Sequence, residues 1–471
     1  MKTVDLVKNR IKEAKCAVLG FGVSNIPLVE ILLKCGNEII VHDKNDIDSL
    51  DPIAKCFQES GVRFVTGDRY LDSIEADIIF RSPGIRPDHR GIVKALEDGA
   101  EMLSEMELFL DLTPAKVLGI TGSDGKTTST TITYKLLEKE FESSKRKVYV
   151  GGNIGTPLLP YVGQMTENDI CVLELSSFQL FTISKSPERS ALTNISPNHL
   201  DWHKDMNEYI SAKKNIYSHG SIHATFNARN EESINLYRNL KMPYSLFSAD
   251  LTLTDVEQLY MHENKPKTVF FVHNGYVCEY DGASVKHLID INKILLPGKH
   301  NIENYMTAVS LTYGLVSNAT VEDVAQTFKG VEHRLEFVRE LDGVKYYNSS
   351  IDSSPSRTSA ALSALNVKPI VICGGYDKNI PFEPLAEALS KCAKAVVLTG
   401  QTSDKILKVL RENKVDIDIH IERNFHDAVV LAKEISKAGD IVLLSPACAS
   451  FDAFKNFMER GNRFKEIVNE F

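Results

Sequence analysis

A glycine-rich turn followed by Lys-Thr-Thr is the feature of this sequence best suited to bind phosphate. An apolar run at residues 117–120 precedes the turn, and a helical pattern follows it. The N–H groups at the start of such a helix bind phosphate oxygens, Lys126 adds a positive charge, and the Thr127 hydroxyl can ligate Mg²⁺. Ile120 stands where the G-x-x-x-x-G-K-[ST] pattern has its first glycine, and a structural turn with a surface lysine is the alternative. We predict a nucleotide-phosphate site made by Gly122, Ser123, Asp124, Gly125, Lys126, Thr127 and Thr128.

A second glycine turn, with Gly20 and Gly22, lies near the N-terminus. Asp43 follows it at the spacing of about 20 residues that is typical of a dinucleotide-binding fingerprint. Asn25 replaces the last glycine of that fingerprint. We therefore interpret this turn, together with the turn at Gly84, as the site of a phosphate-bearing or nucleotide-linked ligand. An NAD-dependent dehydrogenase and a tightly packed turn without a ligand are the alternatives.

Two polar side chains further along the chain, Glu174 and His199, are candidates for metal binding, and the stretch that carries His199 also holds Asp201, His203 and Lys213. Glu174 ends an apolar run, where a parallel sheet opens its ligand crevice, and a carboxylate there can coordinate a metal. His199 and His203, four residues apart, could share a helix face as zinc ligands. Leu200 stands where the H-E-x-x-H motif needs glutamate, so we reject a metalloprotease. His199 taken alone is typical of a buried histidine with satisfied hydrogen bonds.

These side chains need a scaffold, and the sequence alternates short apolar runs with amphipathic segments in three successive regions. Strands that alternate with helices predict an α/β fold with parallel sheets. The polar, less periodic stretches at residues 110–114 and 330–334 are boundary candidates. A chain of 471 residues, at roughly 100 to 200 residues per domain, predicts three domains. We place them at residues 1–112, 113–331 and 332–471.

The composition is typical of a cytoplasmic globular protein. Hydrophobic residues make up 43%, without an apolar run of about 18 residues that would span a bilayer or the apolar core of a signal peptide. The net charge of −9 argues against nucleic acid as the main partner, because that binding depends on clustered cations. The 8 cysteines lack C-x-x-C pairs, which favours buried thiols over disulfides or zinc sites.

Seven sequence blocks together resemble the Mur ligases of peptidoglycan synthesis, which share their fold with folylpolyglutamate synthetase. They follow the family's order over nearly the whole chain: GSDGKTT, GGNIGTPL, LELSSFQL, NISPNHLDWH, AKKNIY, LPGKHNIEN and HRLEFV. The resemblance implies a UDP-binding Rossmann-like domain, a central P-loop-type ATPase domain with a mostly parallel sheet, and a C-terminal Rossmann-like domain for the incoming amino acid. The closing block, LLSPACASFDAFKNFMERGNRF, is most similar to members that add D-glutamate to UDP-N-acetylmuramoyl-L-alanine.

The resemblance also implies roles for individual residues. It assigns the UDP-linked substrate to Gly20, Gly22, Val23, Ser24, Asp43, Gly84 and Asn153. It assigns ATP to the phosphate turn with Asn301, Asn304 and Arg334, and D-glutamate to Lys378, Ser450 and Phe457. The implied catalytic residues are Lys126, Glu174, His199 and Lys213, and the last three, with Thr127, would hold two Mg²⁺ ions. In similar enzymes the lysine that matches Lys213 is carbamylated, which turns a cation into a carboxylate-like anion suited to a metal site.

One block departs from the family pattern. Where the family usually has Asn-Asp-Ser-Lys-Ala-Thr, this chain has NSSIDS at residues 348–353. Ser349, at the ATP ribose, therefore lacks a carboxylate, and Ile351 lacks the cation near the amino-acid carboxylate. We hypothesise that Arg357 supplies the missing positive charge. Asp124, where asparagine is common, adds a negative charge beside the phosphate turn.

The implied reaction is ATP-dependent amide formation by a monomeric enzyme. The alanyl carboxylate attacks the γ-phosphate, and the glutamate amine then displaces phosphate from the acyl phosphate. No covalent protein nucleophile is needed, so Cys448 is expected to be buried. Domain closure should bring the reactants together. Two alternatives stay open: a related ligase for a different amino acid, and a regulatory homologue that binds ATP and UDP-sugar without catalysis.

Overall fold

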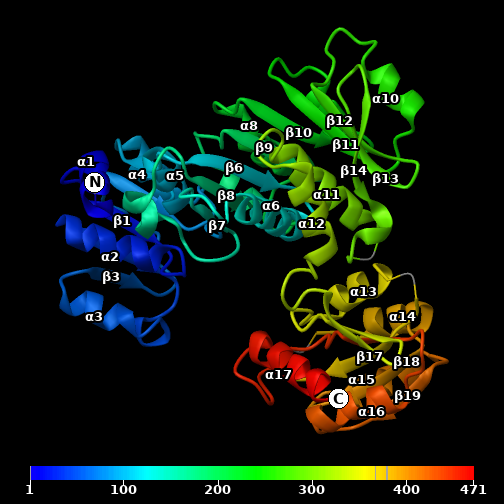
Figure 1. The fold of residues 1–471 in the computed structure, drawn as a ribbon. Coiled ribbons are helices and arrows are strands. Elements are labelled where there is room, and N and C mark those ends of the chain that lie inside the picture. The colour runs from blue at the N-terminus through cyan, green and yellow to red at the C-terminus, as the bar shows by residue number, and fades with distance from the viewer. Residues whose placement is uncertain (1, 297, 366, 378–379) are drawn as a thin grey trace. The chain divides into compact units, whose positions relative to one another are not determined.

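The computed structural model describes residues 2–296, 298–365, 367–377 and 380–471, and it divides into two compact units. The first comprises Met1–Asp290 and Glu303–Val324, and the second comprises Ile291–Ile302 and Ala325–Phe471. The described residues form three sheets, two in the first unit and one in the second (Figure 1). The predicted α/β class is confirmed, and one sheet falls within each predicted domain range. The domain boundaries themselves stay predictions.

The N-terminal sheet of the first unit is parallel, in the order β3-β2-β1-β4-β5. Its strands are β1 (Cys16–Leu19), β2 (Ile39–Asp43), β3 (Arg63–Thr66), β4 (Ile78–Arg81) and β5 (Glu101–Leu103). Its helices are α1 (Thr3–Ile11), α2 (Asn25–Cys35), η1 (Ile47–Ser49), α3 (Ile53–Glu59), α4 (Arg90–Glu97) and α5 (Glu105–Leu112). Helices α1, α2, α3 and α5 pack on one face, and α4 packs on the other. The strand order reverses between β1 and β4, and ligands of open α/β sheets bind at such a switch point.

The central sheet has the order β14-β13-β12-β11-β10-β9-β6-β8-β7. It is parallel from β7 to β12 and antiparallel over β12, β13 and β14. Its strands are β6 (Lys116–Thr121), β7 (Val148–Gly152), β8 (Ile170–Glu174), β9 (Arg189–Leu192), β10 (His223–Asn227), β11 (Tyr244–Ser248), β12 (Thr268–His273), β13 (Tyr276–Tyr280) and β14 (Val285–Asp290). The helices of this region are α6 (Lys126–Glu140), η2 (Leu159–Gln164), α7 (Ser177–Leu180), α8 (Met206–Ser218), α9 (Glu231–Tyr237), α10 (Leu253–Leu259), η3 (Ile291–Lys293), α11 (Lys299–Leu311) and α12 (Asn318–Thr327).

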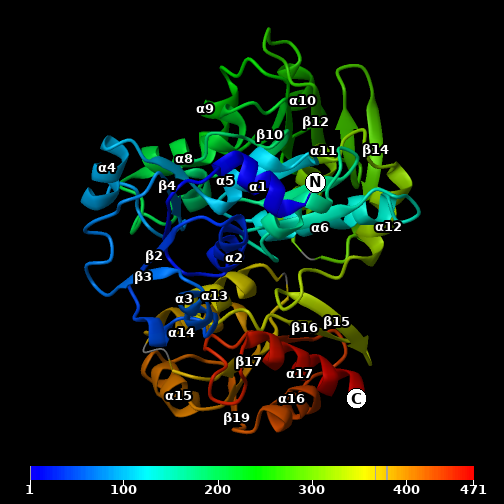
Figure 2. The same ribbon diagram turned by 90° about the vertical axis from the view of Figure 1, so that its left-hand side faces the viewer.

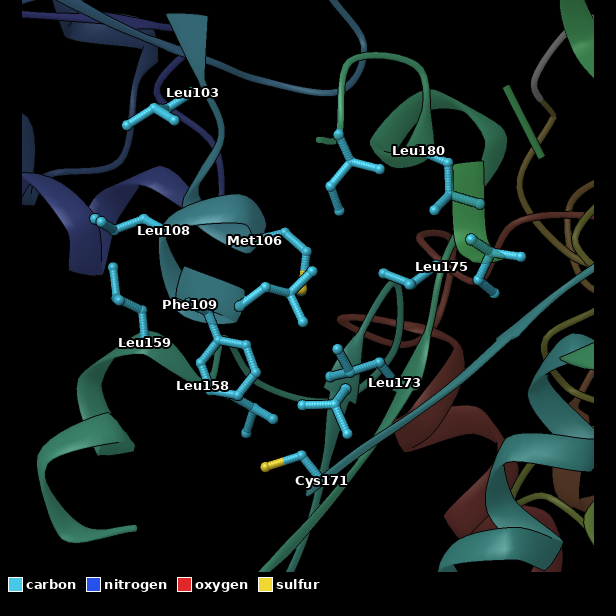
Figure 3. Packing of buried hydrophobic residues seen from close by; sticks show 14 of the residues in the cluster. Leu103, Met106, Leu108, Phe109, Leu158, Leu159, Cys171, Leu173, Leu175 and Leu180 are labelled. Carbon is cyan, nitrogen blue, oxygen red and sulfur yellow. The ribbon is translucent and has the colours of Figure 1, made fainter. Parts of the chain in front are cut away.

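One hydrophobic core joins these two sheets. Figure 3 shows Met106 and Phe109 of α5 in one apolar cluster with Leu158, next to η2, and with Cys171 and Leu173 of β8. Helix α1 packs against α5 as well (Figure 2). Burial of apolar surface is the main favourable term in folding, so this shared core explains why both sheets belong to one compact unit.

The second unit is a three-layer α/β domain, coloured yellow to red in Figure 1. Its sheet has the order β15-β16-β20-β17-β18-β19 and is parallel except for β15. The strands are β15 (Glu336–Leu341), β16 (Val344–Asn348), β17 (Ile370–Gly374), β18 (Ala395–Thr399), β19 (Asp418–Ile421) and β20 (Ile441–Leu444). Helices α13 (Pro355–Ser363), α14 (Glu383–Cys392) and α15 (Ser403–Glu412) pack on one face, and α16 (Phe425–Glu434) and α17 (Phe457–Glu470) pack on the other.

The first boundary candidate, residues 110–114, includes the end of α5 at Leu112, and it stays a prediction. One local expectation from the sequence is wrong. His199 and His203 do not share a helix face, because they lie in a turn before α8, where His199 has a φ of 55°. Six of the 8 cysteines are buried, as expected of thiols in the core. Over the described residues, no helix is long and apolar enough to cross a membrane.

Candidate active site

The predicted phosphate turn lies between β6 and α6, at the carboxyl end of a buried parallel strand. Gly122 has a φ of 153°, and a Cβ atom there would lie 1.8 Å from Thr193 Oγ1. Gly125 has a φ of 76°, and a Cβ atom there would lie 2.4 Å from Asn304 Oδ1. Both positions therefore require glycine. The first N–H groups of α6 have no acceptor within the helix, and they form its positive end, which suits phosphate.

The side chain of Asn194 supports this turn through hydrogen bonds. Its Oδ1 accepts hydrogen bonds from the N–H groups of Ser123 and Asp124, at 3.1 and 2.9 Å. The Ser123 hydroxyl donates to Ser196 O and lies 2.9 Å from Tyr209 OH. Ser123 is thus engaged inside the protein, and its contact with a nucleotide stays a prediction. Sequence reasoning missed Asn194; the available signal was its place directly after a strand in the NISPNH block.

Two lysine side chains meet at one carbonyl group of the turn. Lys126 Nζ donates to the carbonyl oxygens of Gly122 and Ser123, both at 2.9 Å. Lys213 Nζ donates to the same Gly122 oxygen at 2.6 Å and to Thr121 Oγ1 at 3.3 Å. Lys213 is only 1% exposed. Burial lowers the pKa of Lys213 well below its ordinary value, and the charge of Lys126 lowers it further.

Glu174 ends β8 and is fully enclosed. Its Oε1 accepts a hydrogen bond from Asn153 Nδ2 at 2.7 Å, and the Asn153 N–H donates to the Glu174 backbone oxygen at 2.8 Å. In the part of the chain that is described, Glu174 Oε2 has no hydrogen-bond donor. A buried polar atom without a partner costs about 1–3 kcal/mol. A cation bound at Oε2 would offset that cost.

The imidazole of His199 lies near the two lysines. Its ring packs against Phe178 with 4.8 Å between centroids. The side chain of His199 is exposed, so the alternative of a buried histidine is wrong. Partial desolvation, and then the charges of Lys126 and Lys213, lower the pKa of His199. A lower pKa favours the neutral ring, which is the form of histidine that binds metals.

The side chains at the turn suit Mg²⁺ that is also bound by phosphate and water, rather than a metal held by protein groups alone. No group of three or more His, Cys, Asp or Glu side chains that could hold a metal is found among the described residues. Mg²⁺ is commonly held by one or two protein groups together with phosphate oxygens and water. Thr127 in the first turn of α6, the unpaired oxygen of Glu174 and the ring of His199 are three donors, a number that would suit two such ions.

The N-terminal glycine turn lies at the switch point of its sheet. Asp43 Oδ2 accepts a hydrogen bond from the Phe21 N–H at 2.7 Å, so this carboxylate fixes the turn. Asn25 Nδ2 donates to Gly20 O at 2.8 Å, which explains how asparagine replaces the last glycine of the fingerprint. The residues left at the surface or half-buried are Gly22, Val23, Ser24 and, after β4, Gly84. Their contacts with a substrate stay predictions.

In the second unit, Ser349, predicted at the ATP ribose, directly follows β16, and two residues predicted to contact glutamate, Ser450 and Phe457, follow β20. Ser349 is buried, and its Oγ accepts a hydrogen bond from the Leu335 N–H at 3.1 Å. Ser450 is also buried, and Phe457 begins α17. The predicted residue Lys378 lies outside the described residues. The two adenine-side residues are divided between the units, with Asn301 in the second and Asn304 in the first.

Arg460 organises these loops, and sequence reasoning missed it. Its guanidinium donates to Ser350 Oγ and O at 3.0 and 2.9 Å, to Cys448 O at 3.1 Å and to Ala449 O at 3.0 Å. Burial lowers the pKa of Arg460 to about 10. Arginine is rarely buried, so the sequence alone does not indicate this role. Cys448 is buried, as predicted, and burial raises the pKa of its thiol to about 11.

The altered block carries a carboxylate at a new position, and a cation follows the block in α13. Burial raises the pKa of Asp352 to about 6, although the charges of Arg334 and Arg357 partly oppose this rise. The Asp352 Oδ2 atom accepts a hydrogen bond from Ser445 Oγ at 2.8 Å. Arg357 is exposed and donates to Ile351 O at 3.2 Å. A positive charge therefore does lie beside the position where the family has lysine.

Known proteins with similar sequences match this chain over nearly its full length. Residues 120–312 match the Mur ligase middle domain, and residues 333–448 match the Mur ligase glutamate ligase domain. UDP-N-acetylmuramoylalanine--D-glutamate ligase from Clostridium novyi is 45% identical and aligns over 99% of both chains. The chain belongs to the Mur ligase family. The protein of the same name from Acetivibrio thermocellus is 43% identical, over 98% of this chain and 97% of its own.

Solved Mur ligase structures share the fold. MurF from Acinetobacter baumannii has a TM-score of 0.58 at 13% identity and covers 99% of both chains. UDP-N-acetylmuramate-alanine ligase from Thermotoga maritima has a TM-score of 0.53 at 16% identity, over 97% of this chain and 99% of its own. At these identities the likeness concerns the fold alone. Within this Mur ligase, the sequence-predicted residues Lys126, Glu174 and Asn153 lie with Lys213 and His199 at the carboxyl ends of neighbouring central strands.

Proposed function

We propose that this protein joins D-glutamate to UDP-N-acetylmuramoyl-L-alanine at the expense of ATP, in the synthesis of peptidoglycan precursors. Its relatives from Clostridium novyi and Acetivibrio thermocellus are named for this reaction. The strongest structural support is the turn at residues 122–128, which combines a helix N-terminus with Lys126, Lys213 and the half-paired carboxylate of Glu174. Because ATP and UDP-linked sugars are cytoplasmic compounds, we expect the reaction there, carried out by a monomer.

The turn would bind the triphosphate of ATP. The N–H groups at the start of α6 would face the phosphate oxygens, and Lys126 Nζ, which already donates to the turn, would add a positive charge. Mg²⁺, held by Thr127, Glu174 and His199, would offset charge on the transferring phosphoryl group. Phosphoryl transfer needs mainly positioning and electrostatic stabilisation, which these groups provide.

The reaction would then proceed in two steps. A carboxylate oxygen of the alanyl group attacks the γ-phosphorus, the bond from phosphorus to the β–γ bridging oxygen breaks, and ADP leaves. The glutamate amine attacks the carbonyl carbon of the acyl phosphate, the C–O bond to phosphate breaks, and the amine loses a proton. The products are an amide, ADP and inorganic phosphate.

We propose that Lys213 is carbamylated. CO₂ adds only to a neutral amine, and burial beside Lys126 favours the neutral form of Lys213. The product, after loss of a proton, is an anion with two oxygen ligands. Such an anion would remove the repulsion between two ammonium groups and would suit a second Mg²⁺ ion.

The remaining assignments concern the two substrates and the nucleotide base. The UDP-linked substrate would bind at the N-terminal switch point, with Asn153 near its reacting end. Asn301, Asn304 and Arg334 would contact ATP, and Lys378, Ser450 and Phe457 would contact glutamate. The ranges 1–112, 113–331 and 332–471 would then be the UDP-binding, ATP-binding and amino-acid-binding domains.

Phosphate release with UDP-N-acetylmuramoyl-L-alanine and ATP tests this proposal, with D-glutamate compared against L-glutamate and other amino acids. We expect release that depends on D-glutamate and on Mg²⁺. Release with another amino acid alone would indicate a related ligase. Binding of ATP and the UDP-linked compound without release would instead indicate a regulatory homologue whose altered block has lost catalysis.

A further inference from the structure

Two turns of the first unit are joined by two hydrogen bonds, one donated from each turn. The indole Nε1 of Trp202 donates to the backbone oxygen of Gly84 at 3.0 Å, and Arg86 Nη1 donates to the backbone oxygen of Trp202 at 2.5 Å. Gly84 and Arg86 follow β4 of the N-terminal sheet, whereas Trp202 belongs to the turn that carries His199. The predicted UDP side and the predicted metal side of the site are therefore in direct contact here.

Arg86 uses its whole guanidinium to hold this junction. Its two Nη atoms bind the two oxygens of Glu208, at 3.1 and 3.0 Å, and its Nε and Nη2 bind Asp88, at 3.0 and 2.9 Å. The guanidinium also lies 4.8 Å from the centroid of the Trp202 ring. These hydrogen bonds lower the pKa of Glu208 to about 2, so the pair is charged at neutral pH. Lysine cannot reproduce two bidentate contacts and a stacked plane.

The position of His199 depends on this arrangement. The backbone oxygen of His199 accepts hydrogen bonds from the N–H groups of Trp202 and His203, at 3.1 and 2.9 Å. The Phe178 ring packs against both His199 and Trp202, with centroid distances of 4.8 and 4.9 Å. A shift of the Trp202 backbone would therefore move the His199 turn. Glu208 lies in the first turn of α8, the helix that carries Lys213.

A second arginine ties the same two parts together. Arg81, at the end of β4, is 1% exposed. Its Nη2 donates to Phe178 O and Thr182 Oγ1, both at 3.0 Å, and its Nη1 donates to Ile85 O at 2.7 Å. Arg81, in the N-terminal sheet, thus fixes the backbone of Phe178, and the ring of Phe178 packs against His199.

We propose that Arg86 is a positioning residue that fixes the His199 turn against the Gly84 turn. This inference rests on the proposed function, since it places the UDP-linked substrate at Gly84 and Mg²⁺-nucleotide beside His199. A ligand that orders the Gly84 turn would also order the His199 turn, through Trp202 and Arg86. The two ligands should therefore bind with positive coupling, and the coupling must be reciprocal.

The chain offers a direct probe, because Trp202 is its single tryptophan. We would titrate Mg²⁺-ADP by tryptophan fluorescence and by calorimetry, with and without saturating UDP-N-acetylmuramoyl-L-alanine and without glutamate. The proteins are the wild type, Arg86→Gln, Arg86→Lys, and the control Arg90→Gln, which alters an exposed arginine paired with Asp72. We expect the UDP-linked compound to tighten Mg²⁺-ADP binding by about 5-fold or more in the wild type and in the control, but by less than about 2-fold in Arg86→Gln. Arg86→Lys should fall between them.

Equal coupling in Arg86→Gln and in the wild type would overturn the proposal, as would two ligands that bind to the wild type independently. If Arg86→Gln does not fold, Glu208→Gln removes the charge of the partner while keeping its shape, and it should lose coupling to a similar degree. The assay involves no turnover, so coupled binding without phosphate release would contradict the proposed reaction and leave this inference standing. No binding of the UDP-linked compound to the wild type would contradict both.

Discussion

Lys126 and Lys213 donate hydrogen bonds to the same oxygen atom, that of Gly122, at 2.9 and 2.6 Å. Two ammonium groups that share one acceptor repel each other strongly where water is excluded. Lys126 begins α6, and its Nζ donates to the turn, where the proposed function assigns its charge to the phosphate of ATP. Lys213 is the buried partner whose pKa is well below its ordinary value. Burial therefore favours the neutral form of Lys213, which is the form that the proposed carbamylation needs.

The first prediction concerns Lys126. Lys126→Ala should reduce turnover by at least about a hundredfold, the scale for loss of a main electrostatic donor. The measurement is the rate of phosphate release. Lys139→Ala, in the last turn of the same helix, is the matched control and should keep wild-type turnover. Near-normal activity of Lys126→Ala would remove the turn from the mechanism.

The second prediction concerns Lys213. Lys213→Ala should lose activity, and a short carboxylate added to the assay should restore part of it, because it can replace the proposed carbamate anion. Rates with and without the carboxylate measure this. The neighbouring Lys214 is exposed, so Lys214→Ala should be active and insensitive to the carboxylate. A fully active Lys213→Ala protein would exclude this lysine from catalysis.

The third prediction concerns the altered block of the second unit. Arg357→Ala should raise the KM for glutamate by at least about tenfold, as expected when a hydrogen bond to a charged group is lost. The KM for ATP should change less. Arg411→Ala, an exposed arginine on α15, serves as the control. An unchanged glutamate KM in Arg357→Ala would show that another group replaces the missing lysine.

The fourth prediction concerns stability. Glu105, at the start of α5, is buried, and burial raises its pKa from 4.5 to about 7. Between these pH values the native state keeps a proton that the unfolded state releases, so the free energy of unfolding falls as pH rises. Glu105→Gln has no carboxyl group to titrate, so its free energy of unfolding should not fall in this way. It should be more stable than the wild type above pH 7, by up to about 3 kcal/mol, and the gain should vanish near pH 4.5.

Melting temperatures measured by calorimetry at pH 5 and pH 8 would check this dependence. The exposed Glu97 at the end of α4 provides a control, since Glu97→Gln removes one charge without a buried carboxylate. A difference between Glu105→Gln and the wild type that is the same at both pH values would contradict the prediction.

Local sequence patterns predicted the strands and turns that carry the site. The apolar runs that became β1, β6 and β8 each end at a polar or glycine residue, and a parallel sheet gathers such ends at one edge. The alternation of strands and helices does not indicate the antiparallel strands β12, β13 and β14. Residues such as Lys286 and His287 are exposed in β14, and antiparallel pairs do not repeat the strand–helix alternation.

The supporting residues could not be predicted, because their roles depend on neighbours distant in sequence. Asn194 reaches the phosphate turn only because β9 lies beside β6 in the sheet. Arg86 meets Glu208 across 122 positions of the chain. No periodicity or spacing indicates such pairs, and each depends on how two elements pack.

The most direct test of the whole account is a crystal structure of the protein with Mg²⁺ and a non-hydrolysable ATP analogue. The account predicts phosphate oxygens on the N–H groups that open α6, with Lys126 Nζ beside them and the metal near Glu174 and His199. A triphosphate bound elsewhere, with the turn between β6 and α6 left empty, would contradict it.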